Sequence, residues 1–435
     1  MPVRYHLEGG SAHEIVAGVE DALRRGALGP GAALPPVRRL AQELHLSPTT
    51  VAAAYRELRR RGVATGAGRA GTRIRPRPPS PTPLMAAVPK GVRDLRVGWP
   101  DPHLLPALPR ACPSGRLYGE AAVAANLRLV AQEHLGAEGI PTEHLAVVGG
   151  ALDGVERALG ASLRPGDRVV VEDPCYPAVL DLLAAMSLEV LPAGMDDLGA
   201  LPAALGSALA RGAAAAVLSP RAQNPLGAAW DEGRAGELRA VLRRYPEVLL
   251  IEDDHAGPVA GVPLHTLAGA TERWATVRSV SKWLSPDLRL AVLCGDGATV
   301  HKVEGRQALG TGWVSYLLQD MVSELWRDPA TTRLLERAAS TYAARRQALL
   351  GHLAAHGALA SSRSGLTTWV HVGDEVGVAT GLLQAGWAVT PGARFRIAAP
   401  PGIRVAHSTL EPKESARFAA DLARLLSGGP AVRAD

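Results

Sequence analysis

Short, almost uninterrupted apolar runs alternate with longer amphipathic segments from about residue 92 onward. Strands that are buried on both faces have this continuous apolar pattern, and the segments between them have helical spacing. The alternation predicts an α/β domain with a mostly parallel, seven-stranded sheet that carries helices on both faces. The expected strands are 145–148, 168–172, 188–191, 214–218, 248–252, 275–280 and 289–293.

The pattern changes near the end of the chain, at about 325–435. Long helical stretches come first, and short strand-like runs follow them. This order predicts a small α+β C-terminal subdomain beside the large sheet domain. Its expected strands are Thr367–Val372, Ala388–Thr390 and Phe395–Ala398.

The first part of the chain contains three short amphipathic helical patterns. Apolar residues recur at helical spacing over 12–25, and Leu34 with two prolines precedes a second such stretch. Ser47 is suited to N-cap a third helix that has Pro48 at its first position. Two short helices joined by a few residues, the second with a polar outer face, are typical of a helix-turn-helix.

A glycine-tipped hairpin follows these helices. The strand-like runs Val63–Thr65 and Thr72–Arg75 are joined by a glycine-rich segment, which predicts the wing of a winged helix-turn-helix domain over 1–75. The proline-dense segment 76–91 is expected to be a semi-rigid linker. The remaining residues, 92–435, form the body.

Charge is distributed unevenly between these parts. Residues 1–79 carry 13 arginines and 6 acidic residues, a net charge of +7; the whole chain is +5, so residues 80–435 sum to −2. A basic head on a nearly neutral body indicates a polyanionic partner such as double-stranded DNA, although a solvated basic face has the same composition. The apolar runs are too short to span a membrane, no signal-peptide pattern is present and the cysteines are isolated. We therefore expect a cytoplasmic protein without a metal site.

Lys282 is conspicuous because lysine is rare in this chain. Only four lysines, Lys90, Lys282, Lys302 and Lys413, occur among 47 basic residues. An amine can form an imine with an aldehyde cofactor, and a guanidinium cannot. Position alone favours an ordinary surface lysine, so the neighbouring motifs must decide.

Those motifs lie directly after predicted strands, at the edge where parallel α/β sheets bind ligands. The Gly149-Gly150 turn opens a helix, and its N–H groups suit a phosphate. Asn224, Asp253 and Lys282 follow three further strands. A pyridinium nitrogen needs a carboxylate, an aldehyde needs a lysine, and a phosphate needs backbone donors and arginine. The set therefore predicts a cofactor of the pyridoxal type.

The head resembles the GntR family of bacterial regulators through LPPVRRLAQELHLSPTTVAAAYRELRRRGV and GRAGTRIR. The resemblance implies DNA contacts by Arg38, Thr49, Thr50 and the wing residue Arg69. Pro48 departs from the family pattern, in which arginine is common. Hydroxyl groups at a helix N-terminus suit phosphates and base edges, and an arginine at a wing tip suits the minor groove. The alternative is a head that docks protein.

The body resembles fold-type I aminotransferases, which bind pyridoxal 5′-phosphate (PLP), through PDPHLLP, LYG, GGALDG, EDPCYP, NPLG, EDDH, SVSK…R and GIRV. The resemblance implies that Lys282 carries PLP as a Schiff base and that Asp253 pairs with the pyridine nitrogen. The other implied contacts are Asn224 with the ring hydroxyl, Tyr176 with the ring face, Ala151, Leu152, Ser279 and Arg289 with the phosphate, Tyr118 with the phosphate in a neighbouring subunit, and Arg404 with a substrate or effector carboxylate.

Head and body together resemble the MocR-type branch of the GntR regulators, which implies a head-to-tail, domain-swapped homodimer. Two residues depart from the aminotransferase pattern. His255 stands where a tyrosine assists the ring hydroxyl, and Leu152 stands where a polar side chain is usual. Both favour PLP binding with weakened transamination; neutral drift is the alternative explanation.

Three functions are compatible with this sequence. The leading hypothesis is a transcriptional regulator that senses PLP, or a small amine or amino acid that reacts with it, with vitamin B6 metabolism as its narrower expected target. The alternatives are a working aminotransferase with a DNA-binding head and a cofactor-free dimer scaffold. The basic head, the full cofactor set and His255 favour the regulator.

Overall fold

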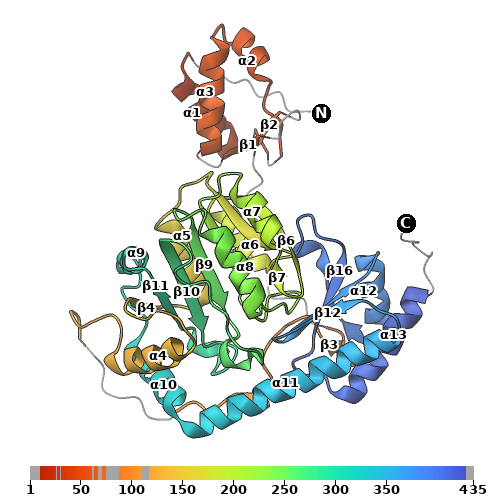
Figure 1. Ribbon diagram of the computed structural model, residues 1–435. Helices are drawn as coiled ribbons and strands as arrows, with labels where there is room; N and C mark the ends of the chain where they lie inside the picture. Colours follow the sequence, from red (N-terminus) through yellow and green to blue (C-terminus); the bar gives the residue numbers. More distant parts are fainter. Residues whose placement is uncertain are drawn as a thin grey trace. The chain divides into compact units, whose positions relative to one another are not determined.

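Three helices and a two-stranded hairpin form the N-terminal head of the computed structural model (Figure 1). The structure describes residues 10–25, 27–29, 31–60, 63–66, 71–74, 88–109 and 117–427. The head elements are α1 (Ala12–Arg24), α2 (Val37–Glu43), α3 (Pro48–Arg60), β1 (Ala64–Gly66) and β2 (Thr72–Ile74). The three predicted helices and the predicted hairpin are all present.

The head has its own apolar core, to which every helix contributes. Ile15 and Val19 of α1, Leu40 of α2, and Tyr55 and Leu58 of α3 are all buried. These are the residues with helical spacing in the sequence, so the burial of one stripe per helix explains the three-helix arrangement.

The start of α3 is held by a side-chain cap. The hydroxyl oxygen of Ser47 accepts a hydrogen bond from the backbone N–H of Thr50 at 3.1 Å and lies 2.7 Å from the hydroxyl of Thr49. A capping oxygen satisfies a backbone donor that the helix itself leaves unpaired. The cap therefore places two threonine hydroxyls at the N-terminus of α3.

The body is built on a central sheet with the strand order β4-β11-β10-β9-β8-β5-β6-β7. Strands β5, β8, β9 and β10 pair in parallel, and β11 runs antiparallel to both of its neighbours. All seven predicted strands are present, and the two-residue β7 raises the count in this sheet to eight. The strands are β4 (Leu145–Val148), β5 (Arg168–Asp173), β6 (Glu189–Asp196), β7 (Gly199–Ala200), β8 (Ala215–Leu218), β9 (Leu249–Asp254), β10 (Arg273–Ser279) and β11 (Ala291–Gly295).

Helices cover the central sheet, as its apolar strands require. Helices α5 and α9 contact each other and strands β4, β10 and β11. A separate buried cluster joins residues of α4, α7, α8 and α10 to alternate strand residues such as Val147 and Leu250. These helices are α4 (Ala125–Ala137), α5 (Ala151–Gly160), α6 (Pro177–Ala185), α7 (Pro202–Leu209), α8 (Glu232–Leu242), α9 (Gly297–Ala308) and α10 (Tyr316–Arg327).

The C-terminal part forms a smaller α+β layer, as expected. Its antiparallel sheet has the order β12-β13-β16-β15, and β14 pairs in parallel with β3 from the start of the body. The long α11 runs past the central sheet and the C-terminal strands (Figure 1). The elements are β3 (Arg93–Asp94), α11 (Pro329–Ala355), β12 (Ala360–Ser361), β13 (Thr367–His371), α12 (Glu375–Gln384), β14 (Trp387–Ala388), β15 (Thr390–Pro391), β16 (Gly402–Ala406) and α13 (Pro412–Ser427).

One predicted strand is wrong: Phe395–Ala398 is irregular and follows a 3-10 turn, Gly392–Arg394. Its backbone groups bond to residues at the end of β5 and just beyond it instead of to a neighbouring strand. The Asp173 carboxylate accepts N–H groups of residues 397, 398 and 399 at 2.7–2.8 Å, and the Phe395 carbonyl accepts the N–H of Cys175. Phe395 is buried but Ile397 is 44% exposed, so apolar residues at alternate positions gave a strand-like pattern to a segment whose N–H groups bond to a side chain instead.

No helix in the described ranges is long and apolar enough to cross a membrane.

Candidate functional site

Lys282 lies in the turn that follows β10, close to charged side chains from distant parts of the chain. Its Nζ donates a hydrogen bond to the carbonyl oxygen of Gly98 at 2.7 Å. Burial, together with the nearby charges of Arg404 and Arg289, lowers the pKa of Lys282 to about 8, while Asp253 opposes this shift. An amine with this pKa has an appreciable neutral fraction near neutral pH, and the neutral amine is the nucleophile.

Asp253 lies at the end of β9 and is almost fully buried. Its Oδ1 has no hydrogen-bond partner among the described residues, and its Oδ2 is 3.7 Å from Nδ1 of His255. Burial raises the pKa of the Asp253 carboxyl, and the charges of His255 and Lys282 oppose that rise. A buried acceptor without a partner is costly, and a protonated pyridine nitrogen is the kind of donor that would satisfy it.

The neighbouring Asp254 points into a buried ion network instead. Its carboxylate accepts hydrogen bonds from Arg221 at 3.0 and 3.1 Å and from Arg278 at 2.6 Å. Both arginines also bond to Glu138. The two guanidinium groups hold the pKa of Asp254 far below its usual range. Successive residues of a strand face opposite sides, so this network anchors the strand end that presents Asp253.

Gly150 and Arg289 form a cradle at the start of α5. Gly150 has φ 115°, and a Cβ at this position would lie 2.9 Å from Nη2 of Arg289. The N–H groups of Ala151 and Leu152 belong to the first turn of the helix, where no backbone acceptor exists within the helix. Ser279 is buried at the end of β10. Backbone donors, a helix N-terminus and a guanidinium together fit a phosphate.

Replacing Gly150 by alanine is therefore expected to weaken phosphate binding. The added Cβ would displace the Arg289 guanidinium and would require a φ that L-residues rarely adopt, at a cost of roughly 1–3 kcal/mol. Affinity for PLP, followed by absorption titration, should fall about tenfold. Gly305→Ala in α9 is the matched control, because nothing lies within 4 Å of its Cβ position. Equal PLP affinities for the two variants would contradict the assignment.

Arg404 on β16 and Asn224 after β8 come together across the two parts of the body. Nη1 of Arg404 donates to Oδ1 of Asn224 at 3.1 Å, and Nη2 bonds to the carbonyl of Arg96. The side chain is buried, yet its Nε has no partner among the described residues. The ring of Tyr176 is 39% exposed, and a charge on Tyr176 would act on Arg404. A buried guanidinium with a free N–H suits a small carboxylate.

Tyr118 is not part of this cluster within one chain. Its side chain is 90% exposed, and its ring contacts Trp313 edge-on at 5.4 Å. The other predicted cofactor residues lie on strand ends, turns and helix starts of the body. In the head, Arg38 and Thr49 are exposed and Thr50 is half-buried, whereas Arg69 lies outside the described residues.

The sequence alone did not identify several groups that complete the site. The Gly98 carbonyl, which accepts from Lys282, is 184 residues away from it in the chain, and no local pattern indicates such a contact. The sequence indicated Arg221 and Arg278 only indirectly. Two adjacent carboxylates at a buried strand end require cationic partners, but the sequence does not say which residues these are. The structure supplies those partners to Asp254.

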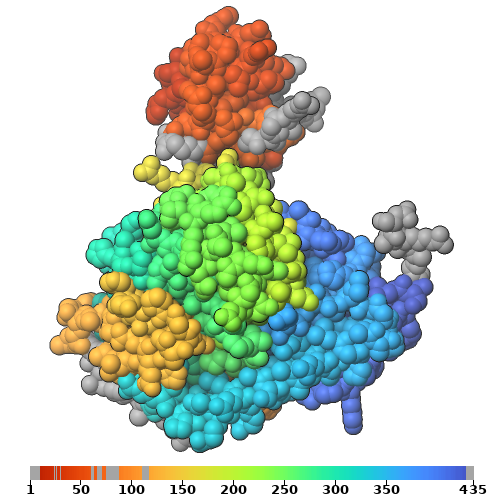
Figure 2. Space-filling view, viewed as in Figure 1, coloured from red at the N-terminus to blue at the C-terminus, as the bar shows by residue number. Residues whose placement is uncertain are grey.

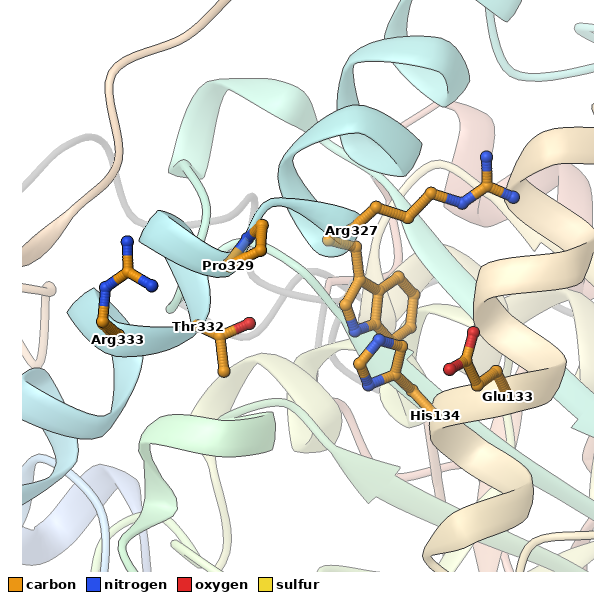
Figure 3. Close-up of a pocket in the computed structure, with 7 residues that line it drawn as sticks. Glu133, His134, Arg327, Pro329, Thr332 and Arg333 are labelled. Atoms are coloured by element: carbon orange, nitrogen blue, oxygen red, sulfur yellow. The ribbon is translucent and has the colours of Figure 1, made fainter.

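A separate hollow of about 390 Å³ is lined by residues of α4, α10 and α11 (Figure 3). The ring of His134 stacks on Trp326 at 5.4 Å. The guanidinium groups of Arg327 and Arg333 extend away from each other in Figure 3, so they do not converge on one anion. None of the predicted cofactor residues lines this hollow.

Comparison with known proteins agrees with this architecture. The family model for aminotransferase class I and II matches residues 95–422, and the model for bacterial regulatory proteins of the gntR family matches residues 11–74. A Pyrococcus horikoshii kynurenine aminotransferase has the same fold as the body, with a TM-score of 0.70 and 21% identity over 78% of this chain and 91% of that protein.

Two relatives are named as transcriptional regulators, one of vitamin B6 salvage and one of pyridoxine biosynthesis. The vitamin B6 salvage pathway transcriptional repressor PtsJ of Salmonella typhimurium is 38% identical over 97% of this chain and 100% of its own length. The pyridoxine biosynthesis regulator PdxR of Corynebacterium glutamicum is 28% identical over 62% of each chain. The chain therefore belongs to the aminotransferase class I and II family, in the MocR-type branch that joins this fold to a GntR-family DNA-binding head.

Proposed function

We propose that this protein is a PLP-binding transcriptional regulator of vitamin B6 metabolism. The observation that carries the proposal is that one chain combines a GntR head with a buried Asp253 carboxylate, one oxygen of which has no hydrogen-bond partner among the described residues, close enough to Lys282 for the two charges to interact. Similarity to PtsJ over almost the whole chain supports the narrower target. PLP itself, or an amine or amino acid that reacts with it, is the proposed effector.

Each site residue has a proposed role toward PLP. Bound PLP supplies an aldehyde that can be exchanged between amines. Lys282 holds it covalently, Asp253 holds the ring nitrogen, and Asn224 and Tyr176 hold the ring oxygen and ring face. Arg289, Ser279 and the N–H groups of Ala151 and Leu152 hold the phosphate, and Arg404 receives an effector carboxylate.

The head is proposed to bind promoter DNA through the N-terminus of α3 and the wing. Arg38 and Thr49 are exposed, and the Ser47 cap fixes the hydroxyl of Thr50 beside them. Arg69 remains the proposed wing contact. Backbone contacts of this kind set register on the duplex, and base-edge contacts set specificity.

A mobility-shift assay on DNA upstream of this gene and of vitamin B6 genes tests the proposal. We expect specific binding whose affinity changes when PLP is added. Arg38→Ala should weaken DNA binding. If Arg38 contacts one phosphate, the slope of log affinity against log salt concentration should become shallower by about 0.9. Lys90→Ala, outside the head, is the control. Absence of specific binding with and without PLP would rule out the regulator.

The active assembly is proposed to be a domain-swapped homodimer in the cytoplasm, in which Tyr118 reaches the phosphate bound by the partner subunit. Exposed apolar side chains support an interface here: Leu117, next to Tyr118, is 76% exposed, and Leu309, four residues before the Trp313 that Tyr118 contacts, is 89% exposed. The segment that contains α4 lies at the surface in Figure 2. Light scattering on the full chain decides between monomer and dimer.

An aminotransferase with a DNA-binding head is the second candidate. The contact between Arg404 and Asn224 favours it, because this pair would receive a substrate carboxylate beside the ring. His255 in place of tyrosine counts against it. Conversion of bound PLP to its amine form by a panel of amino acids would support an aminotransferase. The absence of any conversion would leave the PLP-sensing regulator as the function. The proposed boundaries for both candidates are 1–75, 76–91 and 92–435.

A further inference from the structure

Asp253 lies at the end of β9, and His255, the first residue after that strand, brings its imidazole beside the Asp253 carboxylate. Nδ1 of His255 is 3.7 Å from Oδ2 of Asp253, with the side chains 22% and 11% exposed. The second carboxylate oxygen, Oδ1, has no partner in the described part of the chain. The imidazole therefore occupies one side of the carboxylate and leaves the other side open to a ligand.

Three charged side chains act on the Asp253 carboxylate. Asp254 destabilises its charge, and His255 and Lys282 stabilise it. The charge of Asp254 is already balanced by its two arginine partners. Nearby Glu172, on β5, is buried and has a pKa raised to about 8, so it is mostly neutral at pH 7. Lys282 and, when it is protonated, His255 are thus the groups that favour the ionised form of Asp253.

Cys175 is a further titratable group that interacts with Asp253. Burial raises the pKa of its thiol well above the usual value, with Glu172 and Asp253 as further causes. This thiol stays neutral and contributes no charge. One histidine and one lysine therefore lower the pKa of Asp253, against burial and the charge of Asp254, which raise it.

Under the proposed function, Lys282 forms the covalent link to PLP and no longer provides a free ammonium group. Of these two side chains, only His255 then remains beside Asp253 as an unmodified basic group. We propose that His255 is a positioning residue for Asp253: it keeps this carboxylate ionised and oriented, and the pair holds the pyridine nitrogen of PLP. The inference rests on the proposed function. It assigns His255 to the nitrogen end of the ring and leaves the ring oxygen to Asn224.

Two substitutions separate the charge of the imidazole from its N–H group. His255→Asn keeps a donor close to the position of Nδ1 without a charge, and His255→Phe removes both. His301→Asn, on the exposed side of α9, is the matched control. The affinity of the full chain for PLP is measured by absorption titration at pH values on both sides of about 6.5, the ordinary pKa of histidine.

The wild type and the His301 variant should keep nearly the same PLP affinity across this range. His255→Phe should bind PLP about tenfold more weakly than the wild type at the highest pH, and the difference in affinity should grow as the pH falls. Without the imidazole the Asp253 carboxyl takes up a proton more readily, and a neutral carboxyl attracts a pyridinium weakly. His255→Asn should approach the wild type at high pH and the Phe variant at low pH. An identical pH dependence for His255→Phe and the wild type would overturn the inference.

A second measurement is independent of PLP. With ¹³C-carboxyl-labelled aspartate, the Asp253 resonance is identified in the ligand-free protein by its loss in Asp253→Asn. The carboxyl should titrate at higher pH in His255→Phe than in the wild type, and equal midpoints would also contradict the inference. If the wild type binds no PLP, the proposed function fails, but this titration still decides whether His255 acts on Asp253.

Discussion

Replacing Lys282 by alanine is expected to abolish covalent PLP attachment and to lower PLP affinity at least about a hundredfold. The side chain is the proposed nucleophile, and the charges of Arg289, Arg404 and Asp253 act on its amine. The measurements are the visible absorption of bound PLP and, after borohydride reduction, the mass of the peptide that contains residue 282. Unchanged absorption in the variant would exclude Lys282 as the attachment point.

Two controls accompany this experiment. Lys302→Ala, on the exposed side of α9, should bind PLP like the wild type. Raising the pH from about 7 to about 9 should speed attachment in the wild type and then have little further effect, because the pKa of Lys282 is about 8 and its neutral form reacts. A rate that keeps rising in proportion to hydroxide would indicate a lysine with an ordinary pKa.

The largest expected loss of stability follows from Asp254→Asn. Asp254 is fully buried, and the substitution leaves the Arg221 and Arg278 guanidinium groups without their main counter-charge. Removing one partner of a buried ion network costs about 3–5 kcal/mol. The free energy of unfolding, measured by urea denaturation of the PLP-free protein, should fall by this amount.

The matched control is Glu156→Gln, which makes the same carboxylate-to-amide change in a surface pair. Glu156 lies 3.1 Å from Arg306, with side chains 34% and 42% exposed, so the loss should stay below about 1 kcal/mol. Equal losses of unfolding free energy in the two variants would show that the buried ion network does not stabilise the fold more than a surface pair does.

The same network predicts a pH dependence with a definite sign. The pKa of Asp254 is lowered by folding, so its contribution to stability is present above the unfolded value of about 3.9 and is lost as the pH falls further. Acidification should therefore destabilise the wild type more than Asp254→Asn. Denaturant midpoints at a series of pH values below about 5 measure the difference.

Much of the fold followed from local pattern. The seven expected strands of the central sheet and the three head helices are present. The side of each element that is buried determines the spacing of its apolar residues, and this spacing can be read from the sequence. The run Phe395–Ala398 shows where pattern fails. Its apolar residues alternate as in a strand, but its N–H groups bond to Asp173, a residue more than 220 positions away. Periodicity carries no information about such a partner.

For the site, the sequence by itself determined which chemical groups stand at the strand ends: the amine of Lys282, the carboxylates of Asp253 and Asp254, and the amide of Asn224. Residue type and position after a strand are local properties. Only the tertiary structure decided their partners: Gly98 for Lys282, Arg404 for Asn224, and two arginines for Asp254 but not for Asp253. These partners depend on which distant segments meet in the folded chain, and in the described residues they leave Oδ1 of Asp253 available to a ligand.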